Sequence, residues 1–422
     1  MSSQSTSKSE SDGTPASKIE KKARRLPNWL QGYREYCKDQ EAPETYHLWT
    51  GLSILASAVR RNVWLSQGIY TVYPNLYVIL AGPAGKLGKS TVIRMGRKIL
   101  LHVPDIHMSA DSVTREELIR VMSRSKVNNT CAITVHSTEL SSIIDPSGIK
   151  MIQFLTDIYD CDDTWAYATK GSGRDKLSHP VLNMLAGTTP SWLADGFPAT
   201  AIDHGFTART VFVYEDNPRF LVPRPIEPDQ RILTNLAEDL QQVSILEGEF
   251  DWAEGATDAY DSYYHQLYKT QVPDYRVAGF HWRKRTHLLK VAMLLSVAED
   301  EDLVISKREI SVAAELLKQV ELNMPRSFSA VGKYDYSSDL ERILAFVVEE
   351  GEVDLAEIVR RNYHVGGQAV QEIIQTLKSM HVIDLRRDGS RWTVTATSQA
   401  RTVVPSAGEA PEVRAPPDQS QG

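Results

Sequence analysis

The chain has 422 residues, a formal net charge of −7 and 42% hydrophobic residues. This length allows roughly two to four domains, and the composition allows a sizeable buried core. No apolar run approaches the ~20 residues that span a bilayer, which argues against a membrane protein. The three cysteines stand far apart, without zinc or disulfide spacing, and favour a reducing, cytoplasmic compartment. A simple DNA-coating protein would be basic, so the acidic balance does not argue for nucleic-acid binding. It does not exclude such binding either, because a ring-shaped assembly can confine its positive charge to a central channel.

Residues 1–26 are rich in serine and lysine and predict a disordered tail. Its basic end is either solvated or a weak nucleic-acid arm. Residues 27–70 have aromatic and aliphatic side chains at helical spacing, and Pro43 divides this helical segment into two helices. At the other end, residues 398–422 contain four prolines and predict a second disordered tail.

Between the tails, residues 71–222 alternate short apolar strands with helices, which is typical of a parallel sheet covered on both faces. Residues 223–326 begin with a proline-rich linker and predict an all-helical lid. Residues 337–397 follow the pattern helix, helix, helix, hairpin. The expected fold class is α/β, with a helical segment before the core, and a helical lid and a small helix-and-hairpin domain after it.

A glycine-rich segment between the first core strand and the next helix carries the strongest chemical signal. It reads GPAGKLGKST, from Gly82 to Thr91. Glycines let backbone N–H groups turn toward phosphate oxygens, and a helix N-terminus adds its positive dipole end. This pattern predicts a P-loop that binds ATP and Mg²⁺, with Lys89 on the β- and γ-phosphates and Ser90 on the metal. The expected nucleotide-binding residues are Gly82, Gly85, Gly88, Lys89, Ser90 and Thr91.

The loop is one residue longer than usual, because five residues rather than four separate Gly82 from Gly88. Either Lys86 bulges from the loop or Gly85 takes over the turn. A loop of this kind could also bind nucleotide without hydrolysing it well.

The apolar strand at 131–135 leads to Glu139, a candidate general base that would polarise the attacking water. Thr138 takes the place of the acidic residue that usually supports Mg²⁺, and its hydroxyl could contact a metal-bound water. Four aspartates follow in a short stretch and are interpreted as solvated helix-end charge rather than a metal site: Asp157, Asp160, Asp162 and Asp163.

The order of these motifs over residues 76–325 resembles the AAA+ ATPases. In particular it is similar to the MCM-type replicative helicases and to the primase–helicase ATPases of phages and mobile elements. The resemblance implies that the chain forms an oligomer, usually a hexamer, which hydrolyses ATP between subunits. It also implies DNA, held as a single strand in a central channel, as the partner.

Further site residues come from the same resemblance. It implies that Thr189, with Thr188 as the alternative, is the sensor 1 residue after the strand at 181–186. It implies that Arg209 is an arginine finger that stabilises charge on a neighbouring subunit's nucleotide. Sensor 2 would be Arg283 or Arg285, and the sequence does not choose between them.

Two segments resemble elements that contact DNA in other proteins. Residues 164–177 form a predicted hairpin whose Gly-Ser-Gly tip is flanked by Lys170, Arg174 and Lys176, similar to the hairpin that grips DNA in the channel. Residues 337–397 resemble a winged helix whose wing alone is basic, at Arg386, Arg387 and Arg391. This domain is expected to contact either DNA or replication proteins.

These predictions leave three functions open. The first is a ring-forming, ATP-driven DNA helicase or translocase in the replication of a phage or mobile element. The second is an AAA+ loader or nucleotide switch that assembles another protein on DNA without unwinding it. The third is a nucleotide-gated scaffold with little hydrolysis. The basic hairpin favours a motor, whereas Thr138 and the long P-loop favour a switch.

Overall fold

A computed structural model describes residues 19–145, 148–169, 173–197, 205–270, 272, 274–328, 337–363, 367–388, 391–398 and 400. The described residues divide into two compact units, the first comprising residues 19–328 and the second residues 337–400. Most of the two predicted tails lies outside the described residues.

The first unit is built on a five-stranded sheet with the strand order β4-β5-β8-β3-β9. Its four parallel strands are β3 (Tyr77–Ala81), β5 (Thr130–Ser137), β8 (Val181–Thr188) and β9 (Thr210–Tyr214). The short β4 (Lys126–Val127) is antiparallel to β5. Every residue of β3 and β8 is buried, as strands covered on both faces require. The apolar runs in the sequence therefore predicted the parallel sheet correctly.

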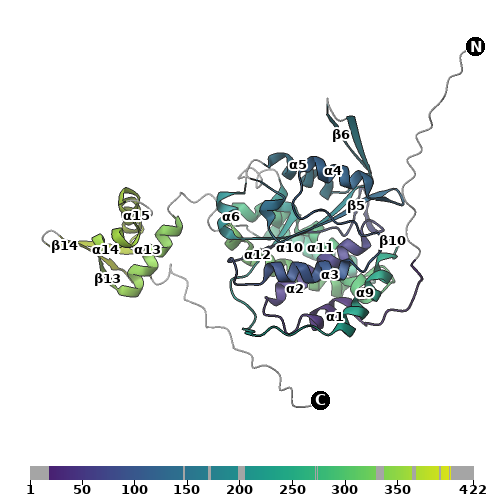
Figure 1. Cartoon of the computed structure of the whole chain (residues 1–422), viewed down its shortest axis with the longest axis horizontal. Coiled ribbons are helices and arrows are strands. Elements are labelled where there is room, and N and C mark those ends of the chain that lie inside the picture. Colours follow the sequence, from purple (N-terminus) through teal and green to yellow (C-terminus); the bar gives the residue numbers. More distant parts are fainter. Residues whose placement is uncertain are drawn as a thin grey trace, which may run out of the picture. The chain divides into compact units, whose positions relative to one another are not determined.

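Helices cover both faces of this sheet (Figure 1). One face carries α2 (Glu44–Val59) and α3 (Lys89–Leu100), and the other carries α4 (Arg115–Arg124) and α5 (Ile149–Tyr159). Shorter helical turns follow at η1 (Leu140–Ser142), α6 (Pro190–Asp195) and α8 (Phe206–Arg209). Side chains from two neighbouring strands reach the helices on opposite faces of the sheet. Asn183 of β8 donates to the Ala56 carbonyl of α2, whereas the Tyr77 hydroxyl of β3 donates to the Leu155 carbonyl of α5.

The N-terminal helical segment is shorter than predicted. Helix α1 (Trp29–Tyr36) and α2 are separated at Pro43, as expected. Beyond Val59, however, Arg60 takes a left-handed φ of 54° and ends the helix. The chain then forms β1 (Val63–Gln67), which pairs with β2 (Tyr70–Val72) and with the distant β10 (Gly248–Glu249). This long-range pairing overrides the helix that the sequence predicted beyond Val59.

The end of the predicted N-terminal tail is bound to the protein rather than disordered. The backbone N–H groups of Arg25 and Leu26 donate to the two carboxylate oxygens of buried Asp239, both at 2.8 Å. The Arg24 guanidinium donates to the carbonyls of Val297 and Ala298 at 2.9 and 2.8 Å. A cation is favourable there because the last carbonyls of a helix lack intrahelical partners. These partners lie over two hundred positions away, so local composition could not indicate them.

The predicted lid consists of α9 (Gln230–Ser244), α10 (Ala256–Lys269), α11 (Tyr275–Glu299) and α12 (Lys307–Ser327). Between them, β11 (Asp251–Trp252) pairs with β12 (Val304–Ile305). The last helix continues through Pro325, and Phe328 packs edge-on against Phe212 of β9 at 4.8 Å between ring centroids. These helices therefore pack against the sheet as part of the first unit. None of the helices that the structure describes is long and apolar enough to cross a membrane.

The second unit contains α13 (Ser337–Glu350), α14 (Leu355–Arg361) and α15 (Gly367–Ser379). Its sheet has the order β13-β15-β14, with β13 at Glu352–Asp354, β14 at Ile383–Asp388 and β15 at Arg391–Ala396. The three helices and the hairpin were predicted, whereas β13 was not. The unit has its own buried core, which includes Ile343, Val347, Val370, Leu377 and Val394.

Candidate nucleotide site

The glycine-rich segment lies at the carboxyl edge of the sheet, between β3 and α3. Because the four strands are parallel, the segments that follow them meet at this edge. Strand β8 lies between β3 and β5, and its last residue, Thr188, is level with Ala81 of β3. Thr138 lies against Gly187, where an added Cβ would meet the Thr138 carbonyl oxygen at 2.5 Å. The topology thus gathers the glycine-rich loop and the ends of β5 and β8 in one place.

The conformation of the loop explains its extra residue. Gly85 and Gly88 have φ of 70° and 61°, a left-handed backbone that glycine adopts without strain. Lys86 turns outward, and its Nζ donates to Oδ1 of Asn217 at 2.9 Å. Leu87 is buried close to Gly82. The chain therefore turns at Gly85, and the Lys86 side chain points away from the loop.

Lys89 is the first residue of α3, and its side chain is buried inside the loop. Its Nζ donates to the carbonyls of Gly82 and Pro83 at 2.7 and 2.9 Å. An ammonium has three N–H donors, so a third can point to a phosphate. Burial lowers the pKa of Lys89, and the nearby carboxylate of Glu139 opposes this shift. Ser90 is half-buried beside it, and Thr91 is exposed.

Glu139 extends this cluster from the end of β5. Its side chain is exposed, and its negative charge favours the protonated form of Lys89. Thr138 is half-buried beside it, so Ser90 and Thr138 supply hydroxyl oxygens near the loop. Within the described ranges, no cluster of three or more histidine, cysteine or acidic residues could hold a metal by itself.

The two threonines at the end of β8 differ in what their hydroxyls do. Thr189 caps α6: its Oγ1 accepts from the Trp192 N–H at 3.2 Å and lies 3.0 Å from the Ser191 hydroxyl. Thr188 is buried beside the loop, and its hydroxyl has no hydrogen-bond partner among the residues that the structure describes. The Thr189 hydroxyl is thus occupied by the helix cap, whereas that of Thr188 is shielded from solvent.

Arg209 lies at the opposite edge of the sheet. It directly precedes β9, whose first residue pairs with Tyr77, the first residue of β3. At about 3.3 Å per residue, the length of β3 separates Arg209 from the P-loop edge by roughly 13 Å. The Arg209 guanidinium instead donates to Oδ2 of Asp160 at 2.7 Å.

The two sensor 2 candidates lie at the same far edge. Arg283 of α11 donates to Oδ1 of Asp160, and its guanidinium lies over the Tyr159 ring. Arg285 donates to the Tyr268 hydroxyl at 2.7 Å. Both arginines line a cavity of about 730 Å³, which Asp160 also lines. The structure therefore does not bring Arg209, Arg283 or Arg285 to the P-loop of the same chain.

A buried histidine holds the Arg209 segment in place. His287 Nε2 lies 2.9 Å from the Ala208 carbonyl, and its Nδ1 lies 3.1 Å from the Tyr159 hydroxyl. Burial lowers the pKa of His287 to about 3, so its ring is neutral and donates from Nε2 while accepting at Nδ1. Asp160 follows Tyr159 and Arg209 follows Ala208 in the chain. The His287 link therefore fixes the backbone positions of Asp160 and Arg209 relative to each other.

Asp160 is the residue of this region that sequence reasoning missed. We interpreted it as solvated helix-end charge, yet it accepts from two arginines that lie 49 and 123 positions away. No local pattern indicates such a contact, because only the packing of α5, α8 and α11 creates it.

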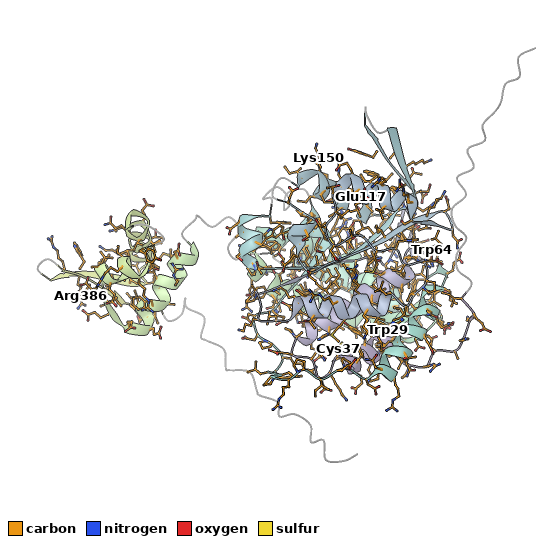
Figure 2. The ribbon with its side chains drawn as sticks, in the orientation of Figure 1. Trp29, Cys37, Trp64, Glu117, Lys150 and Arg386 are labelled. Carbon is orange, nitrogen blue, oxygen red and sulfur yellow. The ribbon has the colours of Figure 1, made fainter. Side chains whose placement is uncertain are left out.

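The predicted DNA-contacting residues lie elsewhere. Strands β6 (Thr164–Thr169) and β7 (Gly173–Ser178) form an antiparallel hairpin that extends beyond α4 and α5 (Figure 1). Lys176 is exposed on β7, whereas Lys170 and the Arg174 side chain lie outside the described residues. In the second unit, Arg386 and Arg387 are exposed on β14 (Figure 2 labels Arg386). The Arg391 side chain is not among those described.

No protein-family model matches the sequence, and no curated protein matches it. One similar solved structure is a full-length MCM homolog from Methanopyrus kandleri, with 14% sequence identity and a TM-score of 0.43. The similarity covers 70% of this chain and 58% of the homolog, so the chain spans less than two thirds of that protein's length. A function for this chain therefore has to be argued from the site itself.

Proposed function

We propose that the chain is an AAA+ ATP hydrolase that assembles into a hexameric ring and moves along DNA as a helicase or translocase. One observation carries this proposal. The P-loop with Lys89 and Glu139 lies at one edge of the sheet, whereas Arg209 and Arg283 lie at the other. Each chain thus has both halves of a site that it cannot close alone. Two copies packed edge to edge bring the arginines of one onto the nucleotide of the other.

Each residue has a distinct role in the proposed site. Backbone N–H groups of the loop and Lys89 bind the phosphates of ATP, and Glu139 orients the attacking water. Ser90 holds Mg²⁺, and Thr138 contacts one of its waters. These oxygen donors fit Mg²⁺, which keeps several waters and takes phosphate oxygens as ligands. The end of β8 senses the γ-phosphate through Thr189 or, as the alternative, Thr188.

The arginines supply positive charge from the neighbouring subunit. Arg209 neutralises charge on the transferred phosphoryl group, as an arginine finger does. Arg283 rather than Arg285 joins it, because Arg283 shares the Asp160 carboxylate with Arg209, whereas Arg285 binds Tyr268.

DNA binding is proposed for two elements. The β6–β7 hairpin, with exposed Lys176, contacts the backbone of a single strand in the central channel. The second unit has the element order of a winged helix and contacts DNA or replication proteins through Arg386, Arg387 and Arg391. The resemblance of the sequence to phage and mobile-element ATPases favours a role in the replication of such an element.

A mixing experiment tests the trans site. Arg209→Ala and Glu139→Gln subunits should each bind ATP and hydrolyse almost none of it. Their mixture should recover phosphate release, because some interfaces join an intact Glu139 to an intact Arg209. A finger of this kind contributes ~10³–10⁵ in rate, so even a minority of such interfaces should exceed background.

Arg285→Ala serves as the matched control on α11 and should keep most of the activity. Light scattering must show that the mixtures assemble. Assembled mixtures that release no phosphate at any ratio would argue against the trans site. Loss of assembly in Arg209→Ala alone would make that residue structural.

The alternative is a loader or nucleotide switch that assembles another protein on DNA. Thr138 favours it, since an uncharged side chain supports Mg²⁺ less strongly than a carboxylate. Strand separation on a forked duplex, with and without ATP, distinguishes the two functions. ATP-dependent separation supports the helicase, whereas ATP turnover without separation supports the switch.

A further inference from the structure

Asp160 divides its carboxylate between two arginines from different elements. It stands at the end of α5, where Oδ2 accepts from Arg209 of α8 at 2.7 Å and Oδ1 accepts from Arg283 of α11. The arginine side chains are 17% and 26% exposed, so both are largely withdrawn from water. Two cations therefore meet on a single anion, close to the protein surface.

Neither arginine uses all of its N–H donors in the contact with Asp160. A guanidinium has five N–H donors in a rigid fork. Arg209 bonds Asp160 through Nη2 and the Gly205 carbonyl through Nη1 at 3.3 Å, and Arg283 bonds Asp160 through Nη2, so Nη hydrogens remain on both side chains. Each guanidinium can therefore keep its bond to Asp160 while it offers other N–H groups to phosphate oxygens.

Removing the anion would change the arrangement of the pair. Without Asp160, two like charges in a partly desolvated position repel each other, and that repulsion is stronger there than in bulk water. The backbone around them would stay in place, because His287 bridges Tyr159 to the Ala208 carbonyl independently of Asp160. The change would thus act mainly on the two arginine side chains.

We propose that Asp160 is a positioning residue, which holds Arg209 and Arg283 in the orientation that the neighbouring subunit's ATP requires. This inference rests on the proposed trans site. Asp160→Asn keeps the shape of the side chain and removes its charge. Because a misplacement of about 1 Å can cost ~10²-fold in rate, we expect turnover to fall on the order of 10- to 100-fold. ATP affinity at the P-loop of the same subunit should not change.

The test places Asp160→Asn in either partner of the mixing experiment. In the Glu139→Gln subunit, which donates the arginines to the active interface, it should lower the recovered phosphate release. In the Arg209→Ala subunit, whose arginine edge faces an inactive site, it should leave the recovered rate unchanged. Asp160→Glu keeps the negative charge, so it should lower the recovered phosphate release less than Asp160→Asn does, and again only in the Glu139→Gln subunit. It replaces Asp160→Asn in the test if that variant folds poorly.

The outcomes separate the inference from the proposed function. The parent mixture is Arg209→Ala with Glu139→Gln. If it recovers phosphate release and Asp160→Asn lowers that release equally in either subunit, Asp160 is merely structural. Recovery with no loss, or with a faster rate, would show that Asp160 does not position the arginines. No recovery in the parent mixture would overturn the trans site itself and, with it, the role of Asp160.

Discussion

Gly82→Ala is the most direct test of how the P-loop is built. A Cβ at Gly82 would lie 2.4 Å from the Glu215 carbonyl oxygen, 2.6 Å from Cδ1 of Leu87 and 2.7 Å from the Tyr46 hydroxyl. Two of these groups are held firmly, because the Tyr46 hydroxyl and the Glu215 N–H both donate to the Ala81 carbonyl. The extra methyl therefore has to displace the loop.

The size of the effect follows from these contacts. Overpacking by one methyl in a tight site costs ~1–3 kcal/mol of stability. The Gly82 carbonyl also accepts from Lys89, so the displacement moves the ammonium that binds phosphate. Losing one hydrogen bond to a charged group costs ~1.5–3 kcal/mol, which corresponds to roughly 10- to 100-fold in ATP affinity.

Titration with a fluorescent ATP analogue and urea denaturation measure the two quantities. Gly85→Asn is the matched control, because a Cβ at Gly85 meets nothing within 4 Å and asparagine tolerates the left-handed backbone. The control should lose little affinity. Gly82→Ala with the affinity and stability of the unaltered chain, or Gly85→Asn with the larger loss, would refute this account of the loop.

Two further predictions concern the loop lysines and the buried histidines. Lys89→Ala should abolish ATP hydrolysis and strongly weaken binding, whereas Lys86→Ala should be mild because Lys86 Nζ binds Asn217; equal losses in nucleotide affinity would mean that the loop is wrongly interpreted. Burial lowers the pKa of His47 to about 4 and those of His136 and His287 to about 3. Since unfolded histidines titrate near ~6.5, only the unfolded chain gains these protons as the pH falls, and each histidine should lower the free energy of unfolding by ~1.4 kcal/mol per pH unit below that value. Urea denaturation at about pH 7 and about pH 5.5 checks this, and equal stability at both would contradict it.

Local sequence patterns were sufficient for the parts of this protein that depend on neighbours along the chain. Apolar strand, glycine-rich turn and helix follow one another between Tyr77 and Leu100, and each element is specified by its own residues. The hairpin at 164–178 was predictable for the same reason. Local sequence patterns failed where a distant partner intervened: Val63 and Trp64 pair with Gly248 and Glu249, and residues 25–26 bind Asp239.

The arrangement of the site was decided by tertiary structure alone. The sequence determined which residues could bind phosphate, polarise water or supply positive charge, because these capacities belong to the side chains. It could not determine the edge of the sheet on which each would stand, since that depends on strand order and on the register of β9 against β3. Nor could it pair Asp160 with Arg209 and Arg283, because ion pairs between separate helices exist only once those helices have packed.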